Sequence, residues 1–209
     1  MKARNLGLVA YQPAWRAMQA FNQARDAQTP DELWLVEHPP VFTLGLAGRR
    51  EHVLDAGGIP VVATDRGGQV TYHGPGQAIA YVLLDLRRNG LGVKELVRRI
   101  EDAVIDTLGT YGIDGARRAG MPGVYVNEAK IAAIGLRIAR GCSYHGVALN
   151  VDADLAPFAR IDPCGYPGLA STRLADLGVR DSIHAVQQRL AASLSRRLAP
   201  RPAEQLHDD

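Results

Sequence analysis

The sequence predicts an α+β domain in which helices pack on a mixed, largely antiparallel sheet. Three segments have the periodicity of amphipathic helices, and seven short runs have the composition of strands. Several strand-like runs follow one another without a helix between them, as in everything from Gly123 to Val151. Such consecutive strands favour antiparallel pairing, whereas a regular alternation of strand and helix would predict a parallel sheet.

Helical periodicity is clearest at residues 14–28, at residues 93–108 and at residues 181–198. The first segment follows Pro13, which suits the start of a helix. In the other two, apolar side chains recur every three or four residues and would share one face. Asp181 stands where the third helix would begin and is expected to be its N-cap. The two apolar faces are Val93, Leu96, Val97, Ile100, Val104 and Leu108, and Ile183, Val186, Leu190, Leu194 and Leu198.

The strand-like runs are rich in apolar residues and are bounded by Gly, Pro, Asn and Asp. They cover residues 33–37, 41–46, 60–64, 78–86, 123–126, 131–138 and 143–151. Asn127 and Glu128 separate two apolar runs and are expected to form a hairpin turn.

The composition is that of one globular domain of 209 residues and 22.5 kDa, with 46% hydrophobic residues. We expect a single catalytic domain over 1–209, with a disordered tail after about residue 200. No apolar run approaches the roughly 18 residues that a membrane span needs. The first residues lack the apolar stretch of a secretion signal, so a cytoplasmic protein is expected. The net charge of +2 is too small to indicate nucleic-acid binding.

Lysine and cysteine are both rare in this chain. Lys2, Lys94 and Lys130 are the lysines among 24 basic residues, so a lysine at a candidate site can be one that arginine cannot replace. In a cytoplasmic protein, Cys142 and Cys164 are not expected to form a structural disulfide. The spacings typical of zinc ligands do not occur, so no metal site is predicted.

A glycine-rich stretch from Arg66 to Gln77 is the first candidate site. Its glycines would let the backbone approach a ligand closely, and Pro75 would stiffen a turn. The phosphate-binding and dinucleotide-binding glycine spacings are absent. The plainer interpretation is a tight loop between two strands.

Two further segments carry residues that could be reactive. Lys130 precedes an apolar run and could be an ordinary lysine at a sheet edge. Cys164 lies between a proline and a glycine in a turn-forming stretch, which favours reactivity, whereas Cys142 begins a strand-like run and is expected to be structural. A thiol with a pKa of about 8.5 needs a nearby cation to become a thiolate at neutral pH. Lys130, His73 and His145 are the candidates, and sequence alone does not choose among them.

Four strings, in this order, resemble the lipoyl(octanoyl) transferases. They are Arg-Gly-Gly-Gln-Val-Thr-Tyr-His-Gly-Pro-Gly-Gln, Ala-Lys-Ile-Ala-Ala-Ile-Gly-Leu-Arg-Ile, His-Gly-Val-Ala-Leu-Asn-Val and Asp-Pro-Cys-Gly-Tyr. The resemblance covers about residues 5–200. It implies the fold of biotin and lipoate protein ligases, a mixed sheet flanked by helices.

The resemblance also implies an activity and a site. A catalytic pair would fall on Cys164 and Lys130, with His145 as a possible accessory group and with no cofactor or metal. The donor would be octanoyl-acyl carrier protein. The acceptors would be lysines of lipoyl domains in 2-oxoacid dehydrogenase complexes and in the glycine cleavage H protein. Substrate contacts would fall on Arg66, Gly67, Gly68, Gln69, Val70, Thr71, Tyr72 and His73, on Ala133, Ile134 and Gly135, and on Gly146, Val147 and Ala148.

Three other functions compete with this interpretation. An ATP-dependent lipoate or biotin protein ligase would share the fold but needs no nucleophilic cysteine, and Cys164 counts against it. A non-catalytic binder of acyl carrier protein or of lipoyl domains would have no need to keep both Cys164 and Lys130. A cysteine hydrolase differs in how water reaches the pocket, which the sequence does not report.

Overall fold

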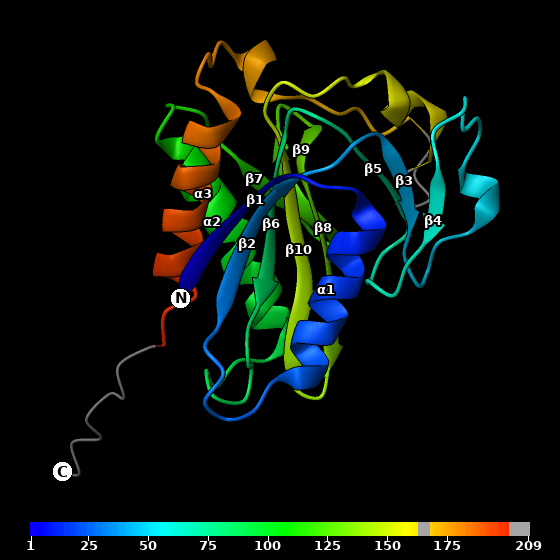
Figure 1. The fold of residues 1–209 in the computed structure, drawn as a ribbon. Coiled ribbons are helices and arrows are strands. Elements are labelled where there is room, and N and C mark those ends of the chain that lie inside the picture. The colour runs from blue at the N-terminus through cyan, green and yellow to red at the C-terminus, as the bar shows by residue number, and fades with distance from the viewer. Residues whose placement is uncertain (163–167, 201–209) are drawn as a thin grey trace.

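The computed structural model describes residues 1–162 and 168–200, and Figure 1 shows how their elements are arranged. The α-helices in these ranges are α1 (Tyr11–Ala24), α2 (Val93–Gly109) and α3 (Ile183–Arg197). The strands are β1 (Lys2–Leu8), β2 (Glu32–Glu37), β3 (Val41–Leu44), β4 (Val61–Ala63), β5 (Val70–His73), β6 (Gln77–Leu83), β7 (Ala116–Arg118), β8 (Met121–Val126), β9 (Ala129–Ala139) and β10 (Cys142–Asn150).

The described strands form a main sheet and a small sheet. The main sheet has seven strands in the order β1-β2-β6-β10-β9-β8-β7. The β1–β2 pair is parallel, and the other neighbours are antiparallel. The small sheet has the order β4-β3-β5, with β3 parallel to β4 and antiparallel to β5. The predicted mixed and largely antiparallel sheet is therefore confirmed.

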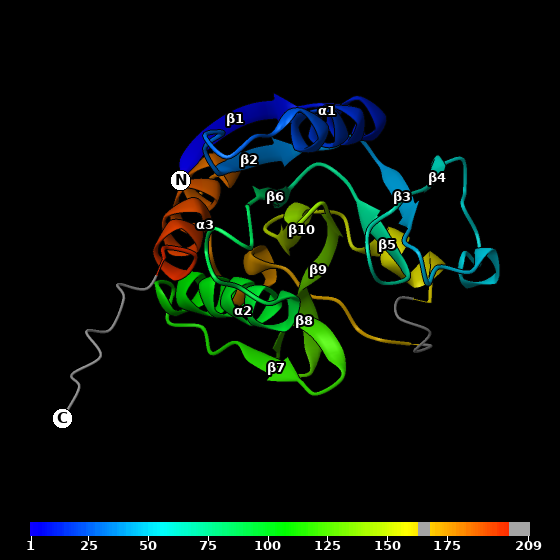
Figure 2. The same cartoon turned by 90° about the horizontal axis from the view of Figure 1, so that it is seen from below.

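Helices cover both faces of the main sheet. Figure 2 shows α1 on one face and α2 with α3 on the other. Central strand β6 is buried along its whole length, which explains its nearly continuous apolar sequence. Its alternate side chains belong to two different cores: Ala80 and Val82 pack toward α2 and α3, and Ile79 and Tyr81 pack toward α1.

The three predicted helices are confirmed, but three of their ends were predicted wrongly. Helix α1 begins at Tyr11 and not after Pro13, because a proline in the first turn costs no helical hydrogen bond. Helix α1 ends at Ala24 because Asp26 organises a turn there: its Oδ1 atom accepts hydrogen bonds from the Gln28 and Thr29 backbone amides at 3.0 and 2.8 Å. The N-cap of α3 is Ser182 and not Asp181, because the Ser182 hydroxyl accepts the hydrogen bond from the Ala185 amide.

The predicted hairpin at Asn127 and Glu128 is confirmed. Both residues have positive φ, 46° and 72°, as a two-residue turn of this hand requires, and Val126 pairs with Ala129 across it. The stretch 66–77 is only partly a loop, because residues 70–73 form strand β5. Strands β1 and β7 were not predicted. Over the described residues, no helix has the length and apolar character of a membrane span.

Candidate functional site

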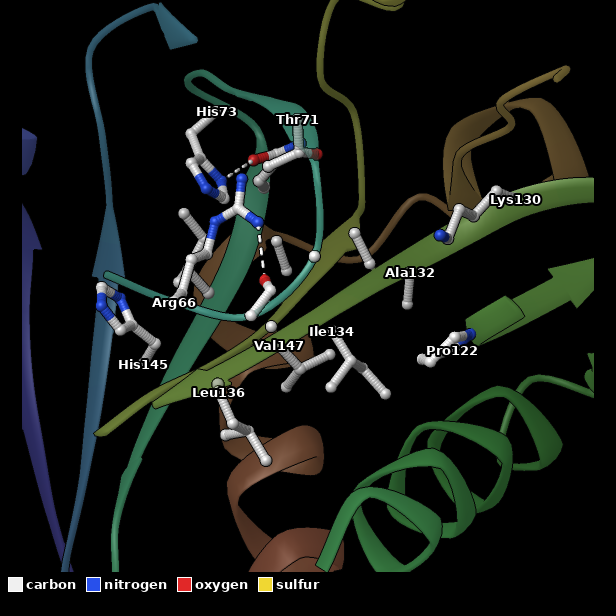
Figure 3. Close-up of a pocket in the computed structure, with 18 of the residues that line it drawn as sticks. Arg66, Thr71, His73, Pro122, Lys130, Ala132, Ile134, Leu136, His145 and Val147 are labelled. Atoms are coloured by element: carbon white, nitrogen blue, oxygen red, sulfur yellow. Dashed lines mark hydrogen bonds between the residues drawn. The ribbon is translucent and has the colours of Figure 1, made fainter. Parts of the chain in front are cut away.

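A pocket of about 290 Å³ lies between the main sheet and the loop that leads into the small sheet. Figure 3 shows Lys130 on one side of this pocket and Arg66, His73 and His145 on the other. Among the residues predicted to contact substrate, those that line it are Arg66, Gly67, Gly68, Gln69, Val70, Thr71, His73, Ala133, Ile134, Gly135, Gly146, Val147 and Ala148. Lys130 and His145 line it as well. The structure therefore gathers these residues around one cavity, and their role as substrate contacts stays a prediction.

Tyr72 is the predicted contact residue that does not line the pocket. It belongs to the core of the small sheet, where its ring packs against Phe42 and Phe158 at centroid distances of 5.6 and 5.5 Å. The physical reason is the alternation of β5, which sends Thr71 and His73 to the pocket and Tyr72 to the opposite side.

Small residues on β9 and β10 make room for the cavity. Ala133 pairs with Ala148, and Gly135 pairs with Gly146. A Cβ atom at Gly135 would lie 3.0 Å from Arg66 Cδ and 3.1 Å from the Gly67 carbonyl oxygen, and one at Gly146 would overlap the Ala80 carbonyl. These positions therefore need glycine because other chain segments approach the strands closely.

Arg66 holds the glycine-rich loop against β3. Its Nη2 atom donates to the Thr43 carbonyl at 2.7 Å, to Thr43 Oγ1 at 2.8 Å and to the Gln69 carbonyl at 2.9 Å. The side chain is buried, and several acceptors satisfy its guanidinium. Arg66 thus fixes the shape of one pocket wall.

Lys130 lies inside the sheet and not at its edge, so the plain interpretation of an edge lysine is wrong. It pairs with Tyr125 on β8, and on its other side it forms a parallel bridge with Ser171. The Lys130 amide donates to the Ala170 carbonyl at 2.8 Å, and the Thr172 amide donates to the Lys130 carbonyl at 3.0 Å. Its Nζ atom lies 5.6 Å from the centre of the Tyr125 ring.

Cys164 lies outside the described residues, so its predicted role is not tested by the structure. The chain on either side is well anchored. The Asp162 amide donates to the His52 carbonyl at 2.9 Å, and Ser171 bridges to Lys130. Cys142 begins β10, as predicted, and its thiol is free and buried. Burial raises the pKa of the Cys142 thiol, which disfavours the reactive thiolate at neutral pH.

His145 has an unusual backbone that turns its side chain toward α1. With a φ of 60°, His145 projects to the same side as its neighbour Tyr144, and both contact Asp65. Asp65 Oδ1 accepts from His145 Nε2 at 2.9 Å, and Oδ2 accepts from the Tyr144 hydroxyl at 2.5 Å. Burial opposes ionisation of Asp65, but the hydrogen bonds from His145, Tyr144 and Gln19 outweigh it and hold the pKa of this carboxyl well below its ordinary value.

A buried cluster of aromatic side chains, which we call the histidine cluster, closes this part of the pocket. It consists of Tyr11, His38, His73, Tyr81 and His145, whose nearest ring centres are 5.3–6.5 Å apart. Sequence analysis missed Tyr11, His38 and Tyr81, because their common location results only from the packing of α1 and β6.

His38 is neutral because of its environment. Its Nδ1 atom lies 2.5 Å from the Val9 carbonyl oxygen, which can only accept, so Nδ1 carries the proton. The Nε2 atom therefore accepts from the Tyr81 hydroxyl, also at 2.5 Å. Burial lowers the pKa of His38 to about 4. Over the described residues, no three or more His, Cys, Asp or Glu side chains are grouped so that they could hold a metal ion.

The chain matches known proteins over nearly its whole length. The family description "Lipoyl protein ligase A/B catalytic domain" fits residues 10–195. An octanoyltransferase of Thiobacillus denitrificans is 62% identical over 193 residues, which cover 92% of this chain and 88% of the relative. An octanoyltransferase of Saccharophagus degradans is 65% identical over 177 residues, 85% of this chain and 82% of the relative.

Solved structures show the same fold at lower identity. A bipartite lipoate protein ligase of Thermoplasma acidophilum, studied with its E2 lipoyl domain, has a TM-score of 0.76 at 19% identity and covers 95% of this chain and 84% of its own. The biotin protein ligase of Aquifex aeolicus has a TM-score of 0.57 at 13% identity, covering 94% and 70%. The biotin and lipoate protein ligase fold is therefore confirmed. With relatives this similar over most of its length, the chain belongs to the lipoyl protein ligase A/B catalytic domain family and, within it, to the octanoyltransferases of lipoate biosynthesis.

Proposed function

We propose that this octanoyltransferase carries the octanoyl group as a thioester on Cys164, between octanoyl-acyl carrier protein and the lysine of a lipoyl domain. Lipoyl domains of 2-oxoacid dehydrogenase complexes and the glycine cleavage H protein are the acceptors that we expect. Lys130 is the acid and base of both half-reactions. The observation that carries the proposal is the pocket, which is lined by small and apolar residues along β9 and β10 and has a lysine on its wall.

In the first half-reaction the Cys164 thiolate attacks the carbonyl carbon of the donor thioester. A bond forms between Sγ and this carbon, and the bond to the donor sulfur breaks. The donor sulfur leaves with the electron pair and takes a proton from the Lys130 ammonium. The products are octanoyl-Cys164, the free thiol of the donor and a neutral amine at Lys130.

In the second half-reaction the amine nitrogen of the acceptor lysine attacks the octanoyl carbonyl. The C–N bond forms, the bond to Sγ breaks, and the sulfur keeps the electron pair as a thiolate. Lys130 takes a proton from the attacking nitrogen and becomes an ammonium again. A thioester is converted to an amide, so the step is downhill and consumes no nucleotide.

The shape and polarity of the pocket suit an octanoyl chain. Val70, Ala133, Ile134, Val147 and Ala148 supply apolar wall along its length. Burial of each CH₂ group contributes about 0.8 kcal/mol, so one carbon more or less changes affinity about four-fold. This is enough to select an acyl group by its length.

The decisive experiment is intact-mass measurement after incubation with octanoyl-acyl carrier protein and no acceptor. We expect one added octanoyl group that hydroxylamine removes and that peptide mapping assigns to Cys164. Cys142→Ala should be acylated like the wild type, and Cys164→Ala should not be acylated. Turnover by folded Cys164→Ala, or turnover that depends on ATP and Mg²⁺, would contradict the proposal.

A further inference from the structure

The second half-reaction releases one more proton than Lys130 takes. The acceptor lysine arrives from water as an ammonium with three N–H bonds, and the amide product keeps one of them. The nitrogen therefore loses two protons, and the neutral Lys130 amine accepts one. The other proton must leave before the attack, because a nitrogen needs a free electron pair to act as a nucleophile.

His73 lines the pocket and has no part in the mechanism above. Its side chain is held by a series of amide contacts that we call the amide chain: His73 to Gln77, Gln77 to Asn150, and Asn150 to the Thr172 carbonyl. The three hydrogen-bond distances are 3.1, 2.9 and 3.0 Å. The amide chain connects β5, β6 and β10 with the segment that pairs with Lys130.

Backbone carbonyl groups fix the orientation of both side-chain amides in the amide chain. The Thr172 carbonyl can only accept, so Asn150 presents its NH₂ group there and its Oδ1 atom to Gln77. Gln77 Nε2 donates to this oxygen and also to the Tyr72 carbonyl at 3.2 Å. Gln77 therefore presents its Oε1 atom to His73.

One tautomer of His73 follows from this orientation. Because Gln77 Oε1 is an acceptor, His73 Nδ1 carries the ring proton and donates it. The Nε2 atom keeps its lone pair. In residues 1–162 and 168–200 no hydrogen bond occupies it, although the ring lies on the pocket wall. Because of the amide chain, Nε2 of His73 can accept a proton and cannot donate one.

We propose that His73 Nε2 takes the first proton of the acceptor lysine, and that Gln77 and Asn150 are positioning residues for the imidazole. The inference rests on the proposed function. The N–H bond of the acceptor ammonium breaks, its electron pair stays on the lysine nitrogen, and the proton binds the lone pair of Nε2. The free amine then attacks octanoyl-Cys164, and the imidazolium releases its proton to water.

The surroundings of His73 favour the neutral imidazole, so an imidazolium formed there releases its proton again. Burial, together with the nearby His38 and Arg66 side chains, holds the pKa of His73 well below its ordinary value. The ring is therefore neutral and ready to accept at physiological pH. An ammonium that enters the same apolar pocket also loses its proton more easily than in water, because desolvation disfavours its charge. The ionisable groups around the ring are Tyr11 of α1, His38 after β2, Arg66 before β5 and His145 of β10.

His145 is less suited to this task, although it lines the same pocket. Its Nε2 atom donates to Asp65, which is ionised, and its side chain is only 2% exposed. The two histidines therefore differ: Nε2 of His73 has no hydrogen-bond partner among the described residues and can accept a proton, whereas Nε2 of His145 already donates to Asp65.

The test separates the two half-reactions by rapid mixing. Acyl-enzyme is first formed from octanoyl-acyl carrier protein, and the lipoyl domain is then added. We expect His73→Gln to form acyl-enzyme within a few-fold of the wild-type rate and to transfer roughly 10²–10⁴-fold more slowly, the range typical of general-base loss. His184→Gln, at an exposed position of α3, is the matched control and should be unchanged in both steps.

The outcomes distinguish the two proposals. A wild-type protein that forms no acyl-enzyme contradicts the proposed function. If the wild-type protein forms acyl-enzyme and His73→Gln transfers the octanoyl group within a few-fold of the wild-type rate, the proposed role of His73 is wrong.

Two further measurements test positioning directly. Gln77→Glu places a carboxylate on the Nδ1 proton and raises the basicity of the ring, so the acid limb of the transfer step should move to higher pH. Uniform slowing without such a move would mean that Gln77 is only structural. Nitrogen-15 spectra of the wild-type imidazoles at neutral pH should show a proton on Nδ1 of His73, and a proton on Nε2 would refute the inference without any variant.

Discussion

The core beneath helices α2 and α3 and the region around the pocket are built differently, although the same strands contribute to both. Toward α2 and α3 the sheet presents aliphatic side chains such as Leu33, Val82 and Leu149, which pack against the stripes of both helices. Around the pocket the same strands present glycine and alanine, and polar groups are held there by hydrogen bonds, as Arg66 and the amide chain show. The core beneath α2 and α3 provides stability by burial, and the pocket region provides defined positions for polar atoms.

This difference predicts that substitutions will separate into two classes. Those in the core beneath α2 and α3 should change the free energy of unfolding and leave the activity of folded molecules intact. Those at Lys130 and at other reactive side chains of the pocket should mainly lower activity, because these side chains contribute chemistry more than buried apolar area.

Lys130→Arg should have the largest effect on activity. Arginine keeps a positive charge but holds its proton with a pKa above about 12, so it cannot serve as acid and base in turn. We expect losses of roughly 10²–10⁴-fold, mainly in transfer to the acceptor amine. Single-turnover kinetics of each half-reaction will measure them. If circular dichroism shows a folded protein and both steps stay within a few-fold of wild type, Lys130 is not the proton carrier.

Leu190→Ala is the counterpart in the core beneath α2 and α3. Leu190 of α3 is fully buried in the core formed with α2, and its truncation should cost about 2–5 kcal/mol of unfolding free energy. Denaturant unfolding gives this cost, and the rate per folded molecule should stay the same. A clear loss of rate below the unfolding range would mean that α3 packing controls the pocket.

The core beneath α2 and α3 was the easier part to predict from sequence. Its periodic Leu, Ile and Val residues identified α2 and α3, since burial on one side leaves a direct pattern in the chain. Strand β1 was missed because Lys2–Leu8 is largely exposed and lacks alternation, so only its pairing with β2 makes it a strand.

The pocket was predictable only where motifs contain consecutive residues. The stretches 66–73 and 146–148 were each predicted as a continuous segment, and both contribute residues to the pocket wall. Tyr11, His38 and Tyr81 come from remote segments, and nothing in their local sequence predicts that they converge. The orientation of Gln77 likewise depends on the Tyr72 carbonyl and on Asn150, which only the folded chain brings to it.

Acidification should weaken the protein through the histidine cluster. The pKa of His38 is near 4 in the folded protein and about 6.5 in an unfolded chain, so the unfolded chain binds the proton first as pH falls. The stabilisation is complete above pH 6.5 and is lost between pH 6.5 and 4. The difference between the folded and unfolded pKa values of His38 corresponds to a loss of about 3 kcal/mol of unfolding free energy. Unfolding free energies at pH 7 and pH 4.5 measure this change, and His184→Gln, outside the cluster, should not alter it. An equal stability at both pH values would show that the folded state protonates His38 without cost.

Cys142→Ala should have the smallest effect. The thiol is buried at the start of β10, outside the pocket, next to Asn22 and Arg25. Removing one sulfur atom from such a site leaves a small cavity, so we expect about 1 kcal/mol less unfolding free energy and unchanged turnover. Because burial raises the pKa of this thiol, an alkylating reagent should not label Cys142 in the native protein and should label it after unfolding. Labelling followed by peptide mass analysis checks this, with Cys164 as the internal comparison. A folded Cys142→Ala protein that has lost turnover would mean that the wrong thiol has been proposed as the nucleophile, or that the two cysteines act together.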